Sequence, residues 1–251
     1  YETDSGRPEE ARRLTYAELQ TAVDACAAGL DAAGVGPGDS VGLYAPMRLE
    51  TVVVMFAAFK LGARFVPVFC GYGEQAVVDR LESCAAKVLF AVPALLRRGK
   101  PTDTGATVRA AAARLPRLHR LIFFDTSEWT EFLAPPARAG KTAEPFPCAR
   151  TAAEDPCLLL YTSGTTGRPK GTVHTHAGCL AQIGKELRYA FDVRAGEPFF
   201  WLTDIGWMMG PWAIIGSLLY RAPVVLFDGV PNYPTGDRLW EMIARLRVVS
   251  L

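Results

Sequence analysis

Short apolar runs alternate with amphipathic segments along nearly the whole chain, and this alternation constrains the fold more than any other feature. Such apolar strands separated by helices are typical of parallel sheets that are covered on both faces. The sequence therefore predicts an α/β fold with mainly parallel sheets and a site at the carboxyl ends of the strands. We expect strands at about 41–45, 65–69, 87–91, 121–124, 157–162, 199–203 and 224–227, and helices at about 16–30, 50–61, 74–84, 106–115, 176–187, 211–220 and 237–245.

A proline-rich stretch predicts where the chain divides. Four prolines lie between residues 134 and 147 with little hydrophobic periodicity, as in a linker. We therefore expect two consecutive doubly wound subdomains, residues 1–145 and 146–251. Because the first residue is Tyr1 rather than Met and residues 248–251 resemble the start of a buried strand, we expect a piece of a longer protein whose second subdomain is incomplete at its C-terminus.

Composition narrows the class of protein. The 251 residues are half hydrophobic with a net charge of +1, so no overall field attracts nucleic acid or an anionic membrane. The apolar run at 51–59 is far shorter than the ~20 residues that a membrane span requires. Six cysteines without a Cys-x-x-Cys pair predict reduced thiols and a cytoplasmic protein, with neither a metal site nor a disulfide framework.

A glycine- and hydroxyl-rich loop follows the apolar run at 157–160. Its sequence, from Tyr161 to Gly171, is Tyr-Thr-Ser-Gly-Thr-Thr-Gly-Arg-Pro-Lys-Gly. Glycines let the backbone approach an anion, while hydroxyls and Lys170 supply donors, which indicates a phosphate-binding loop. Because Gly171 follows Lys170, the spacing differs from that of P-loop NTPases, and an ordinary polar surface turn is the alternative.

This loop closely resembles the signature of the adenylate-forming superfamily, which includes acyl-CoA synthetases and the adenylation domains of peptide synthetases. The segments at 201–212 and 227–241 look like those of its acetyl-CoA synthetase branch. The resemblance implies contacts to the pyrophosphate side of ATP from Thr162, Ser163, Gly164, Thr165, Thr166, Gly167 and Lys170, with Thr165 and Lys170 assisting the chemistry. It also implies ATP, Mg²⁺ accompanying ATP, and CoA as cofactors.

The segment that begins at Trp201 is the predicted substrate pocket. In the branch that it resembles, the two residues after the Gly-Trp pair shape the acyl pocket, together here with Asp204 and Trp207. Those two residues are Met208 and Met209 in place of the Val-Thr pair typical of acetate users, so the pattern does not identify acetate as the acid. The alternative is that these tryptophans and methionines fill the core.

A local basic patch begins at Arg97, Arg98 and Lys100. Its spacing is similar to the acetyl-CoA synthetase segment that meets the nucleotide phosphates of CoA, which implies CoA contacts from Arg97 and Lys100. The alternative is a solvated helix face with arginine stems packed on the protein. Few aromatic residues lie among these charges, so the patch does not indicate nucleic acid.

These features together imply an AMP-forming acyl-CoA synthetase that converts a short- or medium-chain carboxylic acid and ATP to acyl-adenylate and pyrophosphate, and then forms the CoA thioester. The family's C-terminal domain, which carries its adenylation lysine, has no counterpart in these residues, so we expect the 251 residues alone to be inactive. Two alternatives stay open, an adenylating ligase that loads a carrier protein and a non-catalytic nucleotide-binding module.

Overall fold

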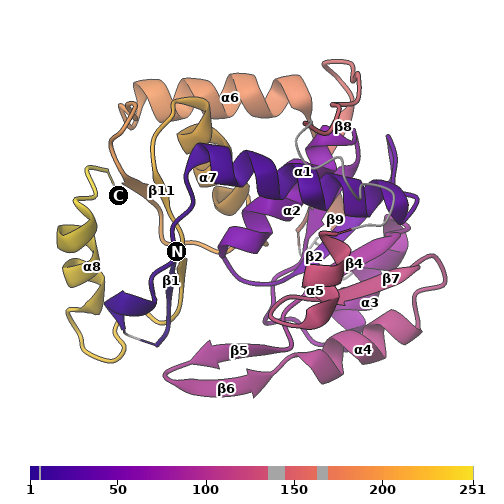
Figure 1. Cartoon of the computed structure of the whole chain (residues 1–251), viewed down its shortest axis with the longest axis horizontal. Coiled ribbons are helices and arrows are strands. Elements are labelled where there is room, and N and C mark those ends of the chain that lie inside the picture. Colours follow the sequence, from indigo (N-terminus) through magenta and orange to yellow (C-terminus); the bar gives the residue numbers. More distant parts are fainter. Residues whose placement is uncertain (6, 135–144, 163–168, 251) are drawn as a thin grey trace.

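A six-stranded sheet forms the centre of the molecule. The computed structural model describes residues 1–5, 7–134, 145–162 and 169–250 (Figure 1). In the sheet the strand order is β7-β4-β2-β3-β8-β9, and every pair is parallel except β8 with β9. The strands are β2 (Ser40–Tyr44), β3 (Arg64–Pro67), β4 (Val88–Ala91), β7 (Arg120–Phe123), β8 (Pro156–Thr162) and β9 (Lys170–Thr175). The predicted α/β fold with mainly parallel pairing is confirmed.

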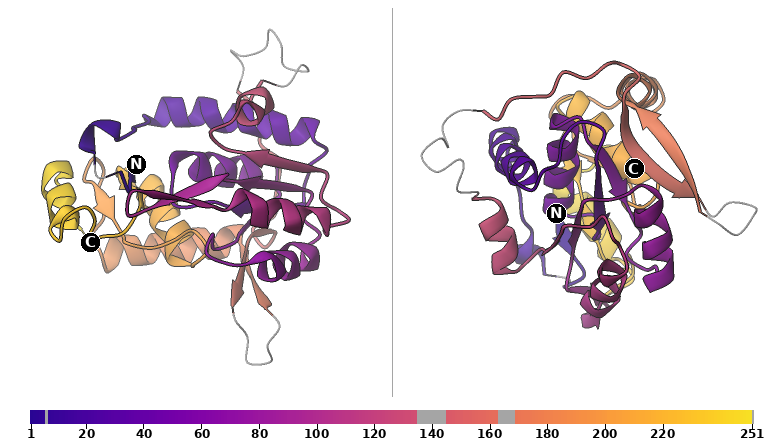
Figure 2. Two further views of the ribbon diagram at one scale, coloured as in Figure 1. Left: turned by 90° about the horizontal axis from the view of Figure 1, so that it is seen from below. Right: turned by 90° about the vertical axis from the view of Figure 1, so that its right-hand side faces the viewer.

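Helices cover both faces of this sheet. They are α1 (Tyr16–Ala32), α2 (Leu49–Lys60), α3 (Glu74–Ser83), α4 (Gly105–Ala113) and α5 (Ser127–Phe132). The chain moves from β2 to β3 through α2 and then reverses direction to reach β4 through α3. Because crossover connections are almost always right-handed, this reversal places α2 and α3 on opposite faces. Figure 2 shows α1 and α2 on one side of the sheet and α3 on the other.

The rest of the chain extends the structure beyond the large sheet. It contains α6 (His176–Tyr189), β10 (Phe199–Phe200), α7 (Met209–Leu219), β11 (Val224–Val225), β12 (Phe227–Asp228) and α8 (Arg238–Leu246). Parallel pairing joins β10 to β11, and the N-terminal strand β1 (Glu2–Thr3), which precedes a 3-10 turn at Pro8–Glu10, joins β12. The N-terminal end of the chain therefore lies beside its last quarter (Figure 1).

A hairpin that the sequence pattern did not predict projects from the region after β4. Its strands are β5 (Ala94–Arg97) and β6 (Lys100–Asp103), which pair in antiparallel register. The division at 145/146 stays a prediction, and the linker expected there lies mostly outside the described residues. Within the described chain, β8 from the second range pairs directly with β3 from the first at Phe65 and Leu158.

The core is continuous between the large sheet and the helices. Every residue of β2 and β4 is buried, which explains the unbroken apolar sequence of β4 and the mostly apolar sequence of β2, where Ser40 is a buried polar residue. Phe90 lies under an aromatic group in which Phe124, Trp129 and Phe132 contact it at ring-centroid distances of 5.2–5.9 Å. Burying one such side chain stabilises the fold by about 2 kcal/mol. No helix in the described ranges is long and apolar enough to cross a membrane.

Candidate active site

The antiparallel β8–β9 pair positions the two described ends of the predicted phosphate loop. Thr162, the last residue of β8, is opposite Lys170, the first residue of β9, and both are exposed. The register between these strands continues from Tyr161 and Gly171 to Leu158 and His174. Ser163, Gly164, Thr165, Thr166 and Gly167 lie outside the described residues. The strand pairing thus holds Thr162 and Lys170 on adjacent strands at one end of a two-stranded ladder.

Asp204 organises the turn that the sequence marked as a substrate pocket. Its Oδ1 accepts a hydrogen bond from the Gly206 backbone N–H at 2.8 Å, and its carbonyl accepts one from the Trp207 N–H at 3.1 Å. Gly206 is required here because a Cβ at this position would lie 2.7 Å from the Phe69 backbone nitrogen. The turn therefore packs closely against the segment that follows β3 at its carboxyl end.

The other predicted pocket residues lie at the start of α7. Met209 is the first residue of this helix and Met208 precedes it. Both methionine side chains are partly buried and pack against the main core, whereas Trp207 is 57% exposed. The segment of the predicted substrate pocket is thus a short turn followed directly by a helix. The alternative that the methionines contribute to the core agrees with their packing.

The hairpin β5–β6 carries Arg97 and Lys100 at its turn, where they are opposite each other across the strands. The two residues have different surroundings. The Arg97 Nη1 group donates to Asp228 Oδ1 at 2.7 Å and to the Leu96 carbonyl at 2.8 Å, while Lys100 is exposed. The Arg97 side chain is therefore held against the protein by its ion pair with Asp228.

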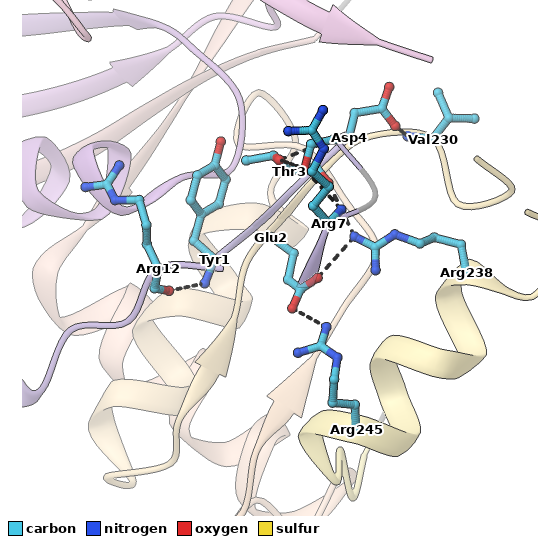
Figure 3. Close-up of polar contacts among 10 residues, drawn as sticks. Tyr1, Glu2, Thr3, Asp4, Arg7, Arg12, Val230, Arg238 and Arg245 are labelled. Atoms are coloured by element: carbon cyan, nitrogen blue, oxygen red, sulfur yellow. Dashed lines mark hydrogen bonds and ion pairs between the residues drawn. The ribbon is translucent and has the colours of Figure 1, made fainter. Parts of the chain in front are cut away.

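Three acidic side chains, Asp4, Asp204 and Asp228, interact electrostatically with Arg97, and the sequence patterns singled out only Asp204. Asp4 accepts a hydrogen bond from the Val230 N–H at 2.8 Å (Figure 3) and another from the Arg98 N–H. Asp228 follows β11 at the end of β12, and its pKa is raised by burial against the opposing effect of Arg97. Because Asp4 and Arg98 are 94 positions apart, no local pattern marks their contact.

Burial makes this region electrostatically unusual. It raises the pKa of Asp204 from its ordinary value of 3.8 to about 6, with a further increase from Asp228 and opposing effects of the Gly206 N–H and Arg97. Burial also raises the pKa of the Cys70 thiol to about 12, and the nearby Asp204 charge adds to the increase. Buried titratable groups near one arginine at the ends of strands are typical of functional sites.

A cavity lies elsewhere in the described part of the chain. It has a volume of about 460 Å³ and lies between the N-terminal segment, the start of α1 and β11, with Tyr1, Arg12, Leu49, Val224 and Arg245 among its lining residues. None of the predicted phosphate, CoA or acyl-pocket residues lines it. Both Arg12 and Arg245 are paired with carboxylates, Arg12 with Glu50 and Arg245 with Glu2.

Comparison with known proteins defines the class. The sequence profile of the family described as AMP-binding enzyme matches residues 3–251, and the chain belongs to this family. The acetyl-coenzyme A synthetase of Rhodopirellula baltica is 34% identical over 260 residues, which cover 99% of this chain and 38% of that protein. Acetyl-coenzyme A synthetase 1 of Candida albicans is 34% identical over 256 residues, with coverages of 99% and 38%.

A solved structure has the same fold. The acetoacetyl-CoA synthetase from Streptomyces lividans superimposes with a TM-score of 0.88 at 32% sequence identity, over 98% of this chain and 38% of that one. The chain therefore spans well under half the length of the relatives that it matches. The resemblance to the adenylate-forming superfamily and its acetyl-CoA synthetase branch is confirmed.

Proposed function

We propose that these residues form part of an AMP-forming acyl-CoA synthetase that activates a short- or medium-chain carboxylic acid. The family match over residues 3–251 carries this proposal, and the described positions of Thr162 and Lys170 support it. Relatives named for acetyl-CoA and acetoacetyl-CoA synthesis favour a short acid. In this reaction the acid attacks the α-phosphate of ATP, pyrophosphate leaves, and the thiol of CoA then displaces AMP.

The residues of this chain would contribute mainly charge and position. Lys170 at the start of β9 would oppose the charge of the β- and γ-phosphates, and the loop from Thr162 to Gly167 would provide hydroxyl and backbone donors. Mg²⁺ would accompany ATP and neutralise part of the phosphate charge. Transfer at phosphorus depends chiefly on such orientation and charge stabilisation, so no covalent role is assigned to the loop.

Met208 and Met209 would shape the side of the acyl pocket next to Asp204 and Trp207. Their longer side chains replace the Val-Thr pair of acetate users, so we expect an acid other than acetate to be preferred. Asp204, whose pKa of about 6 keeps part of its population neutral at slightly acidic pH, would limit the negative charge that faces an anionic substrate.

The first test is ATP–pyrophosphate exchange with acetate, propionate, butyrate, longer acids and acetoacetate, measured for these 251 residues and for the full translation product of the gene. We expect acid-dependent exchange from the full product and none from the 251 residues alone. Exchange near that of a complete synthetase from the 251 residues alone would contradict the second expectation. No exchange with any acid would favour a nucleotide-binding module.

A Lys170→Ala variant of the active protein tests the phosphate loop separately. We expect the rate of pyrophosphate exchange to fall by about 100-fold, because a cation that stabilises the transition state is lost. Lys185→Ala is the matched control, since Lys185 is an exposed lysine on α6 that contacts Gln182. Exchange that is unchanged in Lys170→Ala would remove the residue from the proposed site.

Lys100→Glu tests the assignment of the hairpin to CoA. We expect the Michaelis constant for CoA to rise while acid-dependent exchange stays the same. Arg97 is less suitable for charge reversal because its contact with Asp228 also supports the fold. Arg117→Glu, at an exposed arginine that follows α4, is the control. An unchanged constant for CoA would favour delivery to a carrier protein or a different CoA surface.

A further inference from the structure

Two cysteines that are distant in sequence are in contact where α6 packs next to β8. Cys157 is the second residue of β8, and Cys179 lies in the first turn of α6, 22 positions later. Their Sγ atoms are 3.9 Å apart, and the Cys157 thiol also faces the His174 carbonyl at 3.5 Å. The register of the ladder shifts between Pro156 and Leu158, so Cys157 lies at an irregular position of β8.

The contact is specific to this pair. Cys26, Cys70 and Cys84 are buried, Cys148 is exposed, and none of these four makes a sulfur–sulfur contact in the described part of the chain. Cys157 is 1% exposed and Cys179 is 5% exposed. A buried cysteine without a sulfur neighbour acts as a small apolar side chain. Their proximity gives them a chemistry that the other cysteines lack.

The two thiols are chemically unequal. A hydrogen bond from the Cys157 thiol to the Cys179 sulfur stabilises the Cys179 thiolate and lowers the pKa of Cys179, against the effect of burial. The same bond raises the pKa of Cys157. Cys179 also lies in the first turn of α6, where the helix dipole favours negative charge. Cys179 is therefore the nucleophile of the pair, and Cys157 is the second thiol.

We propose that Cys157 and Cys179 form a site of reversible oxidative modification, at which hydrogen peroxide converts the pair to a disulfide between β8 and α6. The Cys179 thiolate attacks one peroxide oxygen, the O–O bond breaks, and with one proton a water leaves, so that Cys179 becomes a sulfenic acid. The Cys157 sulfur then attacks the Cys179 sulfur, the S–O bond breaks, and a second water leaves with the thiol proton. Two thiols and one hydrogen peroxide give one disulfide and two waters, and the thiols lose two electrons.

The geometry requires only a small movement. Bond formation shortens the sulfur–sulfur distance from 3.9 Å to about 2.05 Å. The disulfide would close a loop of the chain from residue 157 to residue 179. This loop contains all of β9 and most of β8. Closing a loop of this size restricts the unfolded chain, so the oxidised protein should melt about 5 °C higher than the reduced protein. A small thiol reductant reverses the change.

The experiment uses a Cys148→Ser background, which removes the exposed thiol. The folded protein is treated with hydrogen peroxide, its remaining thiols are blocked with N-ethylmaleimide, and its peptides are mapped by mass spectrometry. We expect a peptide linked through Cys157 and Cys179 that has lost two hydrogens and disappears with dithiothreitol, together with the higher melting temperature. Cys157→Ser and Cys179→Ser should each abolish both changes, whereas Cys84→Ser, at a buried cysteine without a sulfur partner, should keep them.

Two results would overturn the proposal. In one, peroxide leaves Cys157 and Cys179 as free thiols in the folded protein while both are blocked readily after denaturation. In the other, the linked peptide forms only when the protein is denatured before oxidation. Because neither measurement depends on ATP, an acid or CoA, the result is independent of the proposed enzymatic function.

Discussion

Asp204 shows how a single carboxyl group can make stability depend on pH. Its pKa is raised to about 6 in the folded protein, mainly by burial, from 3.8. A carboxyl group with a raised folded pKa binds more protons in the folded state, so the free energy of unfolding falls as the pH rises from about 4 to about 6. The hydrogen bond from the Gly206 N–H offsets only part of the free-energy cost of ionising Asp204 in the folded protein.

We predict that Asp204→Asn raises stability above pH 6. The amide oxygen can still accept from Gly206, while the cost of ionising a buried carboxyl disappears. Relative to the unchanged protein, the free energy of unfolding of the variant should increase by roughly 1 kcal/mol between pH 4 and pH 7, after allowance for partial exposure. Urea denaturation at the two pH values measures this difference. A difference that is independent of pH would show that Asp204 ionises normally.

The Arg97–Asp228 contact should contribute more to the free energy of unfolding than a similar contact at the surface. Their atoms are 2.7 Å apart and the Asp228 side chain is 9% exposed, whereas Arg114 and Glu74 are 2.8 Å apart with both side chains more than 40% exposed. We predict that Asp228→Ala lowers the free energy of unfolding by about 2 kcal/mol and Glu74→Ala by no more than about 0.5 kcal/mol. Denaturant titration of both variants checks this, and equal losses would contradict it.

At the scale of elements, the start of α1 follows a local rule. The Thr15 side chain accepts from the Glu18 backbone N–H at 3.2 Å, and the Glu18 carboxylate accepts from the Thr15 backbone N–H at 2.7 Å. These reciprocal bonds satisfy donors that have no partner inside the helix. The Thr-x-x-Glu pattern carries all of this information within four residues.

We predict that Thr15→Ala lowers the free energy of unfolding by about 1 kcal/mol, because the Glu18 N–H loses its acceptor. Thr21→Ala is the matched control, since Thr21 is an exposed threonine inside the same helix that bonds only to the Ala17 carbonyl. The control should change stability by less than about 0.5 kcal/mol. Both variants are compared by thermal and urea unfolding, and an equal effect would show that the cap contributes nothing specific.

Local patterns predicted the elements that depend on local burial. Strands such as β2 and β4, in which every residue is buried, are visible as apolar runs, and helix ends such as that of α1 have their own signals. The hairpin β5–β6 was missed because β6 is wholly exposed and Leu95 is the one buried residue of β5, so neither strand forms a buried apolar run, and their charged residues read as a basic patch. The long strands expected at 199–203 and 224–227 are only two-residue pairs.

The candidate site was also predictable only where its residues lie in a local sequence pattern. Thr162, Lys170 and the turn at Asp204 belong to contiguous motifs, so sequence alone could single them out. The link between Arg97 and Asp228 spans 131 positions, and the one between Asp4 and Val230 spans 226. Partners of this kind are brought together only by the packing of strands, which no window of sequence contains.

At the scale of the whole molecule, ion pairs join the N-terminal strand β1 to α8, the last helix. Glu2 is 2% exposed, and its carboxylate meets Arg238 at 3.1 Å and also Arg245, both on α8 (Figure 3). The Glu2 backbone N–H also donates to the Leu226 carbonyl at 2.9 Å. Because Arg238 is itself 4% exposed, its charge depends on Glu2 for compensation.

We predict that Glu2→Ala lowers the free energy of unfolding by about 3 kcal/mol, because it leaves the Arg238 charge buried and unpaired. It should also speed proteolytic cleavage within α8 before the large sheet is cut. Glu10→Ala is the control, since the Arg7–Glu10 pair is well exposed on both sides. Chemical denaturation and limited proteolysis are the measurements. A loss no larger than that of Glu10→Ala would show that solvent reaches Arg238.

The pairing of β1 with β12 also sets an order of events during synthesis. Glu2 is opposite Phe227, so the N-terminal strand finds its neighbour only after more than nine-tenths of these 251 residues have been made and have left the ribosome. The strands from β2 to β7 lie between, and their partners among themselves are available much earlier. During synthesis β1 therefore leaves the ribosome before β2 to β7 but pairs with its neighbour only after their partners are available.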